Sequence, residues 1–232
     1  MWKFLVLGTL GALGALQAGG AHGGSLSALE RRWLSGIEPV LAFARATGYP
    51  LTVVVQPQPT PGLTPMGMAV EDGRCTLVLS MRGNPKVADL LDRVEPDLMN
   101  ATLELMAAHE LAHCQRHLDG RFASLPANFT AEQLPQNWSS EKPRACHHSS
   151  MVWREEGYSD LVGLAWTRLR HPALYARLHA WLVDLRSNDA TRHSDHDTTM
   201  WLKLVQNGNV LADPALFANA EAIWARGLAD EN

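Results

Sequence analysis

The pattern of apolar and polar positions divides the chain into helical and strand-like stretches. Apolar residues recur at helical spacing from Leu26 to Leu41, and Pro39 and Gly48 are placed to begin and end a second helix. The run from Leu51 to Val55 is rich in valine, is typical of a strand and is followed by a proline-rich loop. The chain therefore opens with two predicted helices and a strand.

Two further strand-like runs, Met66 to Val70 and Cys75 to Met81, predict a β-hairpin. They meet at Asp72-Gly73, and this residue pair favours the tight two-residue turn that joins antiparallel strands. We therefore expect a short antiparallel sheet.

Helical periodicity dominates the rest of the chain. Asn84-Pro85 has the chemistry of a helix start, and another helix is expected to begin at Asp97 and to end near Gly120. Residues 121–150 are polar and irregular. A helix is expected at 151–170, with an interruption at His171-Pro172 and a second helix that follows it and ends at Arg186. Two more helices are expected at 200–205 and 214–228. The pattern predicts an α+β fold, mainly helical, in which the small antiparallel sheet precedes the helix that ends near Gly120.

The first 21 residues predict an export signal, which leaves residues 22–232 as a single domain. Lys3 precedes an apolar stretch from Phe4 to Leu16, and small residues up to Ala21 offer a cleavage site. The apolar stretch is shorter than the roughly 20 residues that a membrane-spanning helix needs. We therefore expect a periplasmic or secreted protein with no stable membrane insertion after signal removal.

Charge and cysteine content limit the function classes. Twenty basic and 24 acidic residues give a net charge of -4, and without a basic patch we expect no nucleic-acid partner. In an oxidising compartment two of Cys75, Cys114 and Cys146 could pair, leaving one over. A Cys114–Cys146 bridge would tie the intervening loop to the site described next, and three buried free thiols are the alternative. The oligomeric state stays open.

The strongest chemical signal is His109-Glu110-Leu111-Ala112-His113, an H-E-x-x-H motif within an apolar helical stretch. Histidines four residues apart lie on one helix face, so both imidazoles can bind one metal ion. Glu110 lies beside them, where it can take a proton from a metal-bound water. The motif predicts a zinc site with Glu110 as the general base.

A catalytic zinc needs a third protein ligand, and the helix predicted from residue 151 supplies the candidate. Glu156 and Asp160 are four residues apart, so both carboxylates project from one face. We predict that Glu156 binds the metal and that Asp160 accepts a hydrogen bond from a ligand histidine. Glu155 is the competing ligand, but Ser159, four residues after it, offers no carboxylate for the second role.

The two motifs together resemble the gluzincin zinc metallopeptidases, in particular the M48 type. That group shows an E-F-x-A-D-like sequence after its H-E-x-x-H motif, and Glu156-Gly157-Tyr158-Ser159-Asp160 matches its acidic ends. The resemblance spans about residues 51–170 and implies a zincin-like fold. It also implies that His109, His113 and Glu156 hold zinc. Finally, it implies that the strand Cys75 to Met81 is an edge that binds an extended peptide by β-addition.

Members of this group often stabilise the oxyanion with a residue that follows the glutamate helix. Residues 192–197 are the corresponding segment here. His196 is preferred over His193, because Asp195 or Asp197 could orient it. A solvent-exposed loop histidine is the simpler alternative, and a separate transition-metal site formed by both histidines is a third.

These features predict a zinc-dependent endopeptidase that hydrolyses a peptide or protein substrate outside the cytoplasm. The alternative is a catalytically inactive zinc-binding scaffold with a zincin-like fold. The presence of Glu110 argues against the scaffold, because metal binding alone does not need that carboxylate.

Overall fold

The computed structural model describes residues 25–56, 64–126, 129, 145–188 and 194–230. The predicted export signal lies outside these residues. The helices are α1 (Ala28–Ala46), α2 (Pro85–Leu91), α3 (Met99–Leu118), α4 (Ala145–Arg170), α5 (Tyr175–Ser187), α6 (Thr199–Leu204) and α7 (Leu216–Asp230), with short 3-10 helices at Pro172–Leu174 and Gly208–Leu211. The strands are β1 (Leu51–Val55), β2 (Met66–Glu71) and β3 (Arg74–Leu79).

Helix α1 is continuous, so the prediction of a second helix starting at Pro39 is wrong. Ser27 and Glu30 form a reciprocal capping box at its start, and Pro39 lies inside it. One face of α1 from Trp33 to Ala44 is buried and packs against α3. Burial of this uninterrupted face outweighs the loss of the one backbone hydrogen bond that proline cannot donate.

The sheet is mixed rather than antiparallel. Strands β2 and β3 form the predicted hairpin, and both turn residues, Asp72 and Gly73, have the positive φ angles that the turn requires. Strand β1, however, pairs parallel to β3, and the order in the sheet is β1-β3-β2. After β1, the chain leaves a space in the sheet and forms β2 at the opposite edge. The hairpin then places β3 between β1 and β2.

Strand β3 is therefore central, and its predicted role as a substrate-binding edge is wrong. Leu77, for example, pairs with Val53 on one side and with Met68 on the other. Among the described strands, β2 is paired on one side only, and it is β2 that contacts α3 most extensively. The sheet edge nearest the motif helix thus belongs to β2.

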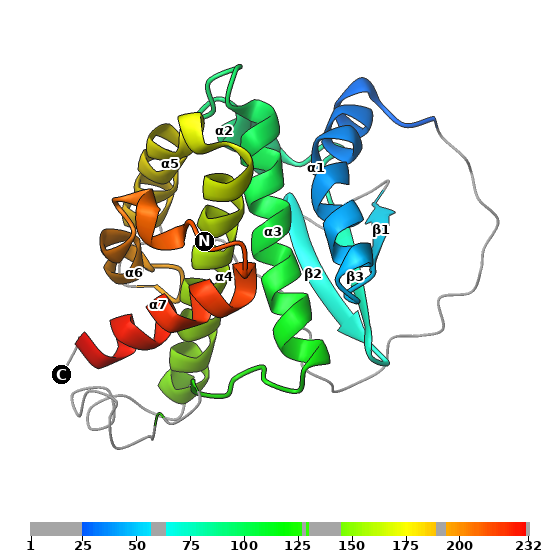
Figure 1. The fold of residues 1–232 in the computed structure, drawn as a ribbon. Helices are drawn as coiled ribbons and strands as arrows, with labels where there is room; N and C mark the ends of the chain where they lie inside the picture. Colours follow the sequence, from blue (N-terminus) through cyan, green and yellow to red (C-terminus); the bar gives the residue numbers. More distant parts are fainter. Residues whose placement is uncertain (1–24, 57–63, 127–128, 130–144, 189–193, 231–232) are drawn as a thin grey trace.

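Helix α3 runs through the middle of the molecule, between the sheet with α1 on one side and helices α4 to α7 on the other (Figure 1). It begins at Met99 rather than at Asp97, whose carboxylate instead forms an ion pair with Arg177 of α5. It ends at Leu118, just before Gly120, which has a positive φ of 65°. Helix α3 thus contacts both halves of the fold.

Helix α4 begins at Ala145, six residues earlier than predicted from the apolar pattern. The predicted interruption after Arg170 is confirmed, because a 3-10 turn at Pro172–Leu174 separates α4 from α5. Helices α3 and α4 form the most extensive helix–helix contact among the described elements. This contact places the two sequence motifs face to face.

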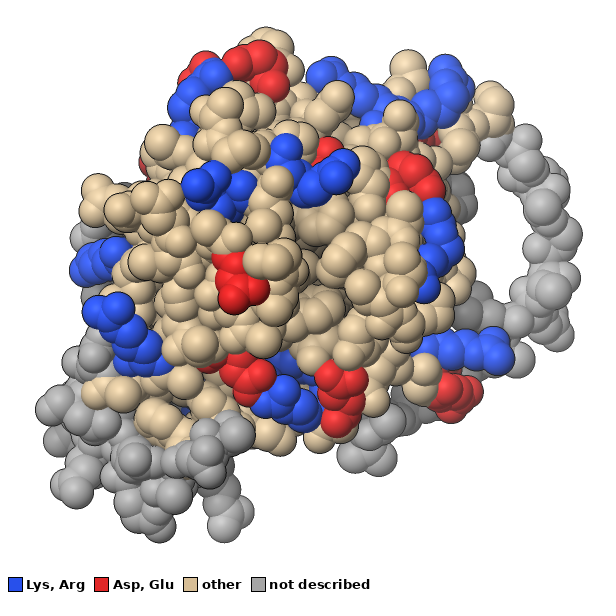
Figure 2. Space-filling view, viewed as in Figure 1, with Lys and Arg blue, Asp and Glu red and all other residues tan. Residues whose placement is uncertain are grey.

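The surface drawn in Figure 2 carries basic and acidic side chains interspersed among uncharged ones, and neither sign dominates this face. In the part of the chain that the structure describes, we find no helix with both the length and the apolar composition required to cross a bilayer.

A disulfide joins Cys75 of β3 to Cys114 of α3. This bond fixes the pairing that the sequence left open, and it excludes both a Cys114–Cys146 bridge and three free thiols. Both cysteines are buried in the core between sheet and helix. Cys114 directly follows His113, and the bond therefore fastens the motif helix to the central strand within one residue of a candidate ligand.

We expect removal of this disulfide to destabilise the fold. The bond closes a loop of 39 residues, for which chain entropy predicts a contribution of about 4 kcal/mol to the free energy of unfolding. The double variant Cys75→Ala/Cys114→Ala should accordingly unfold at a clearly lower denaturant concentration than the wild type. Reductant should destabilise the wild type but leave the double variant unchanged. Equal stability of wild type and variant under oxidising conditions would contradict the assignment.

Candidate metal centre

Three side chains from α3 and α4 bring their donor atoms together in the interior. His109 and His113 lie one turn apart on α3, and Glu156 faces them from α4; their donor atoms all lie within 4.8 Å of one another. The distances are 3.2 Å between the two histidine Nε2 atoms, 3.5 Å from His109 Nε2 to Glu156, and 3.3 Å from His113 Nε2 to Glu156. All three side chains are buried. The group can hold a metal ion.

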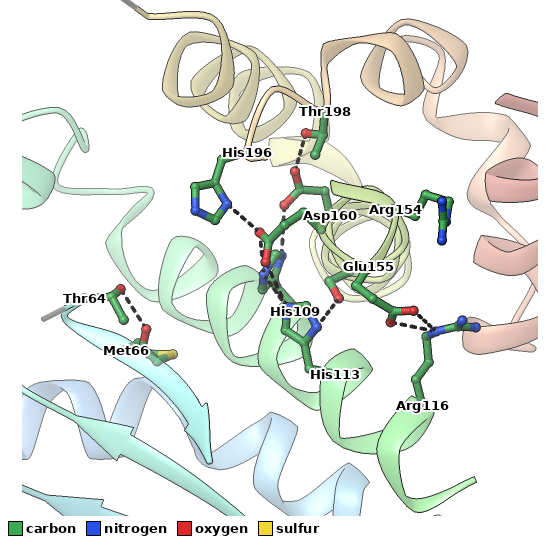
Figure 3. Close-up of polar contacts among 12 residues, drawn as sticks. Thr64, Met66, His109, His113, Arg116, Arg154, Glu155, Asp160, His196 and Thr198 are labelled. Atoms are coloured by element: carbon green, nitrogen blue, oxygen red, sulfur yellow. Dashed lines mark hydrogen bonds and ion pairs between the residues drawn. The ribbon is translucent and has the colours of Figure 1, made fainter. Parts of the chain in front are cut away.

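Asp160 orients His109. Its carboxylate lies 2.9 Å from His109 Nδ1 and accepts a hydrogen bond from the Thr198 hydroxyl (Figure 3). It also accepts hydrogen bonds from Arg186. Burial raises the pKa of Asp160, but the charge of Arg186 and the His109 hydrogen bond outweigh it and hold the pKa at about 2. The carboxylate is ionised, so His109 Nδ1 must donate the proton. Burial lowers the pKa of His109, which leaves a neutral ring with its Nε2 lone pair toward Glu156.

His113 is held by a different partner. Its Nδ1 lies 3.2 Å from the Ser159 hydroxyl, while Nε2 points toward Glu156. Burial lowers the pKa of His113, but the hydrogen bond and charge of Glu156 outweigh burial and raise it to about 9. In the metal-free chain a proton therefore lies between His113 and Glu156, in the place where a cation would bind. Metal binding must displace it.

The structure separates the two competing glutamates. Arg116 donates to both oxygens of Glu155, at 3.0 and 2.7 Å, and the backbone N–H of Ala123 donates to the same carboxylate. Figure 3 shows Glu155 turned toward Arg116. Glu156 instead faces the histidines, and although burial raises its pKa, His109 and the other histidines hold that pKa well below the usual range. Glu156 is the carboxylate at the site, as the spacing to Asp160 predicted.

Glu110 is a buried carboxylate beside the metal group with unused hydrogen-bonding capacity. Its Oε2 has no hydrogen-bond partner among the described residues, and the backbone of Met68 in β2 lies close enough to the side chain to lower its pKa slightly. Burial raises the pKa of Glu110 to about 8. Glu110 and His109 line a cavity of about 30 Å³, which has room for about two water molecules. The carboxylate can therefore exchange a proton with water beside the metal group.

His196 also reaches the site, so the interpretation as a solvent-exposed loop histidine is wrong. It is buried, and its Nδ1 lies 3.3 Å from Glu156. Its loop is held by the Trp153 indole N–H, which donates to the Asp197 carbonyl at 2.6 Å, and by Thr198, which donates to Asp160 at 2.5 Å. His193, the alternative, lies outside the described residues. His196 thus lies beside the three-ligand group and is not part of it.

Three residues that the sequence reasoning did not assign to the site support it: Arg186, Thr198 and Trp153. Of these, Arg186 could have been identified as a buried residue from the sequence. It continues the apolar face of α5 at four-residue spacing after Leu178 and Leu182, all three being buried. A charged residue at such a position needs a buried partner. The contacts of Thr198 and Trp153 join distant segments and leave no local pattern.

Comparisons with protein-family models, curated proteins and solved structures find no match to this chain.

The raised pKa of Glu110 predicts a pH-dependent penalty on stability. In the metal-free protein the folded chain holds this proton up to pH of about 8, whereas the unfolded chain releases it near 4.5. Stability is therefore lost as the pH rises between these values. Glu110→Gln removes the penalty and should be more stable than the wild type by roughly 2–4 kcal/mol at pH 8.

Denaturant unfolding in the presence of a chelator measures this difference. The two proteins should have similar stability at pH 5, where both side chains are neutral, and diverge as the pH rises. A constant difference across this range would show that Glu110 does not titrate in this way.

Proposed function

We propose that the chain is a zinc-dependent peptidase of the gluzincin type that acts outside the cytoplasm. The proposal depends on one observation: a buried His-His-Glu group lies beside a cavity and beside Glu110, a buried carboxylate with one oxygen that has no hydrogen-bond partner in the described part of the chain. A predicted export signal and the Cys75–Cys114 bond support the location, because disulfides persist in oxidising compartments.

The donor set and its spacing fit zinc. Two imidazoles and one carboxylate form a typical catalytic zinc site, with ligand distances of about 2.0–2.1 Å and tetrahedral geometry. Donor atoms around such an ion are about 3.3–3.4 Å apart, and the observed separations are 3.2, 3.3 and 3.5 Å. His196 falls outside the group, which leaves a fourth position for water.

The charges near the site also suit a divalent cation. Glu110, Glu156 and Asp160 are buried carboxylates, and Arg186 is the buried cation that contacts two of them. With all three carboxylates ionised, the group carries two excess negative charges. Burying such an excess is costly unless a cation compensates it.

Zinc bound there would lower the pKa of a water molecule and polarise the substrate carbonyl. Glu110 would accept the proton of the attacking water and pass it to the nitrogen of the leaving amine. The imidazole of His196 would donate a hydrogen bond to the carbonyl oxygen as it becomes negative. Asp160 and Arg186 keep His109 in the tautomer that binds metal.

The surroundings suit an extended peptide. Strand β2 has an unpaired edge among the described strands, and the backbone of its Met68 lies close to Glu110. A substrate strand that adds to β2 would therefore lie next to the general base, a role for β2 in place of the predicted β3. The cavity beside Glu110 has mostly apolar walls and would receive an apolar side chain; the apolar residues are Met66, Leu90, Leu105, Met106, Trp181, Leu182 and Leu185.

The inactive-scaffold alternative accounts poorly for Glu110. A structural carboxylate is expected to be paired, as Glu155 is with Arg116, whereas Glu110 keeps a buried oxygen without a partner among the described residues. A buried carboxylate oxygen without a partner lowers the stability of the fold, and it is retained where the chemistry of the site requires it.

Kinetics of two variants test the peptidase proposal. Zinc-loaded Glu110→Gln should retain its metal and lose peptide hydrolysis by at least about 1,000-fold. His196→Ala should also retain zinc and lower kcat by about 100-fold with a smaller change in KM. A library of quenched fluorescent peptides with apolar residues provides the assay. If the wild type is fully zinc-loaded and cleaves none of them, or if Glu110→Gln cleaves at the wild-type rate, the proposal is wrong.

A further inference from the structure

We propose that Ser159 is a positioning residue that orients His113 for metal binding, as Asp160 orients His109. The inference rests on the proposed metal site but not on peptide hydrolysis.

The two supporting residues are consecutive on α4 and serve consecutive turns of α3. Asp160 lies 2.9 Å from Nδ1 of His109, and the Ser159 hydroxyl lies 3.2 Å from Nδ1 of His113. Glu156, the third ligand, precedes them by one turn on the same helix. A single stretch of α4 thus supplies both the ligand Glu156 and the two residues that orient the ligand histidines.

The direction of the hydrogen bond follows from metal binding. His113 must present the Nε2 lone pair to the cation, so its proton is on Nδ1. The Ser159 oxygen then accepts this proton and fixes both the tautomer and the ring orientation. Among the described residues no other side chain lies within hydrogen-bond distance of this nitrogen.

The hydroxyl of Ser159 has no other evident use. The residue is fully buried in the middle of α4, where an unpaired hydroxyl is unfavourable. Its only side-chain contact with a polar group of the described chain is with His113. Packing alone would not require a hydroxyl at position 159, because alanine would suffice. The hydrogen bond to His113 therefore explains why the residue is serine.

A hydroxyl also suits the charge of the site. When Glu110 is ionised, the carboxylates of Glu110, Glu156 and Asp160 together with Arg186 leave two excess negative charges for a divalent cation to balance. A second supporting carboxylate at position 159 would add a buried negative charge without a partner. Serine orients His113 and leaves the charge balance intact.

Zinc affinity of Ser159→Ala tests the role, with Thr167→Val as the matched control. Thr167 is also buried on α4, but its hydroxyl donates to the Gly163 carbonyl, away from the ligands. Competition with a chromophoric chelator should show zinc binding about tenfold weaker in Ser159→Ala, unchanged in Thr167→Val and restored in Ser159→Thr. Equal affinity in wild type and Ser159→Ala, or equal losses in Ser159→Ala and Thr167→Val, would overturn the proposal.

A measurement on the wild type does not depend on any variant folding. Imidazole ¹H–¹⁵N spectra of the zinc-loaded protein should show a protonated Nδ1 of His113 that exchanges slowly with solvent. A His113 ring with its proton on Nε2 would overturn the proposal. A wild type that binds zinc in this way but cleaves no peptide would contradict the peptidase function alone.

Discussion

The close contact between α3 and α4 is the interaction on which the rest of the structure depends. Gly163 of α4 lies against the backbone of α3, where an added Cβ would come within 2.9 Å of the Leu105 carbonyl oxygen. This approach brings Glu156 to the two histidines and Asp160 to His109. Shape complementarity along the two helices, rather than any single polar contact, therefore sets the donor spacing.

Buried charges are tolerated only when they have partners. The polar cluster at this contact accordingly has partners from several elements. Arg186 reaches the carboxylates from α5, and Thr198 and Trp153 fix the loop that carries His196. The disulfide at Cys114 secures α3 from the side of the sheet. Glu110 keeps a buried carboxylate oxygen that has no hydrogen-bond partner among the described residues, and such an exception is typical of a residue kept for chemistry.

Local spacing predicted the parts of the site that lie within one helix. The i, i+4 pairs His109/His113 and Glu156/Asp160 each share a helix face, and the structure brings the two faces together. The hairpin at Asp72-Gly73 was also predicted correctly, because its signal lies in two adjacent residues. Strand order, the partner of Cys114 and the contact of Arg186 with Asp160 depend on segments far apart in the chain. Periodicity carries no signal for such pairings, which is why the edge strand was predicted wrongly and the disulfide pairing stayed open.

Zinc per chain in the purified protein, measured beside Glu156→Gln and Glu155→Gln, tests the metal centre most directly. The two glutamates are neighbours in the sequence and both are buried, yet only Glu156 faces the histidines. We expect about one zinc in the wild type and in Glu155→Gln, and loss of most of the zinc in folded Glu156→Gln. Full zinc in Glu156→Gln, or none in the wild type under metal-replete conditions, would contradict this expectation.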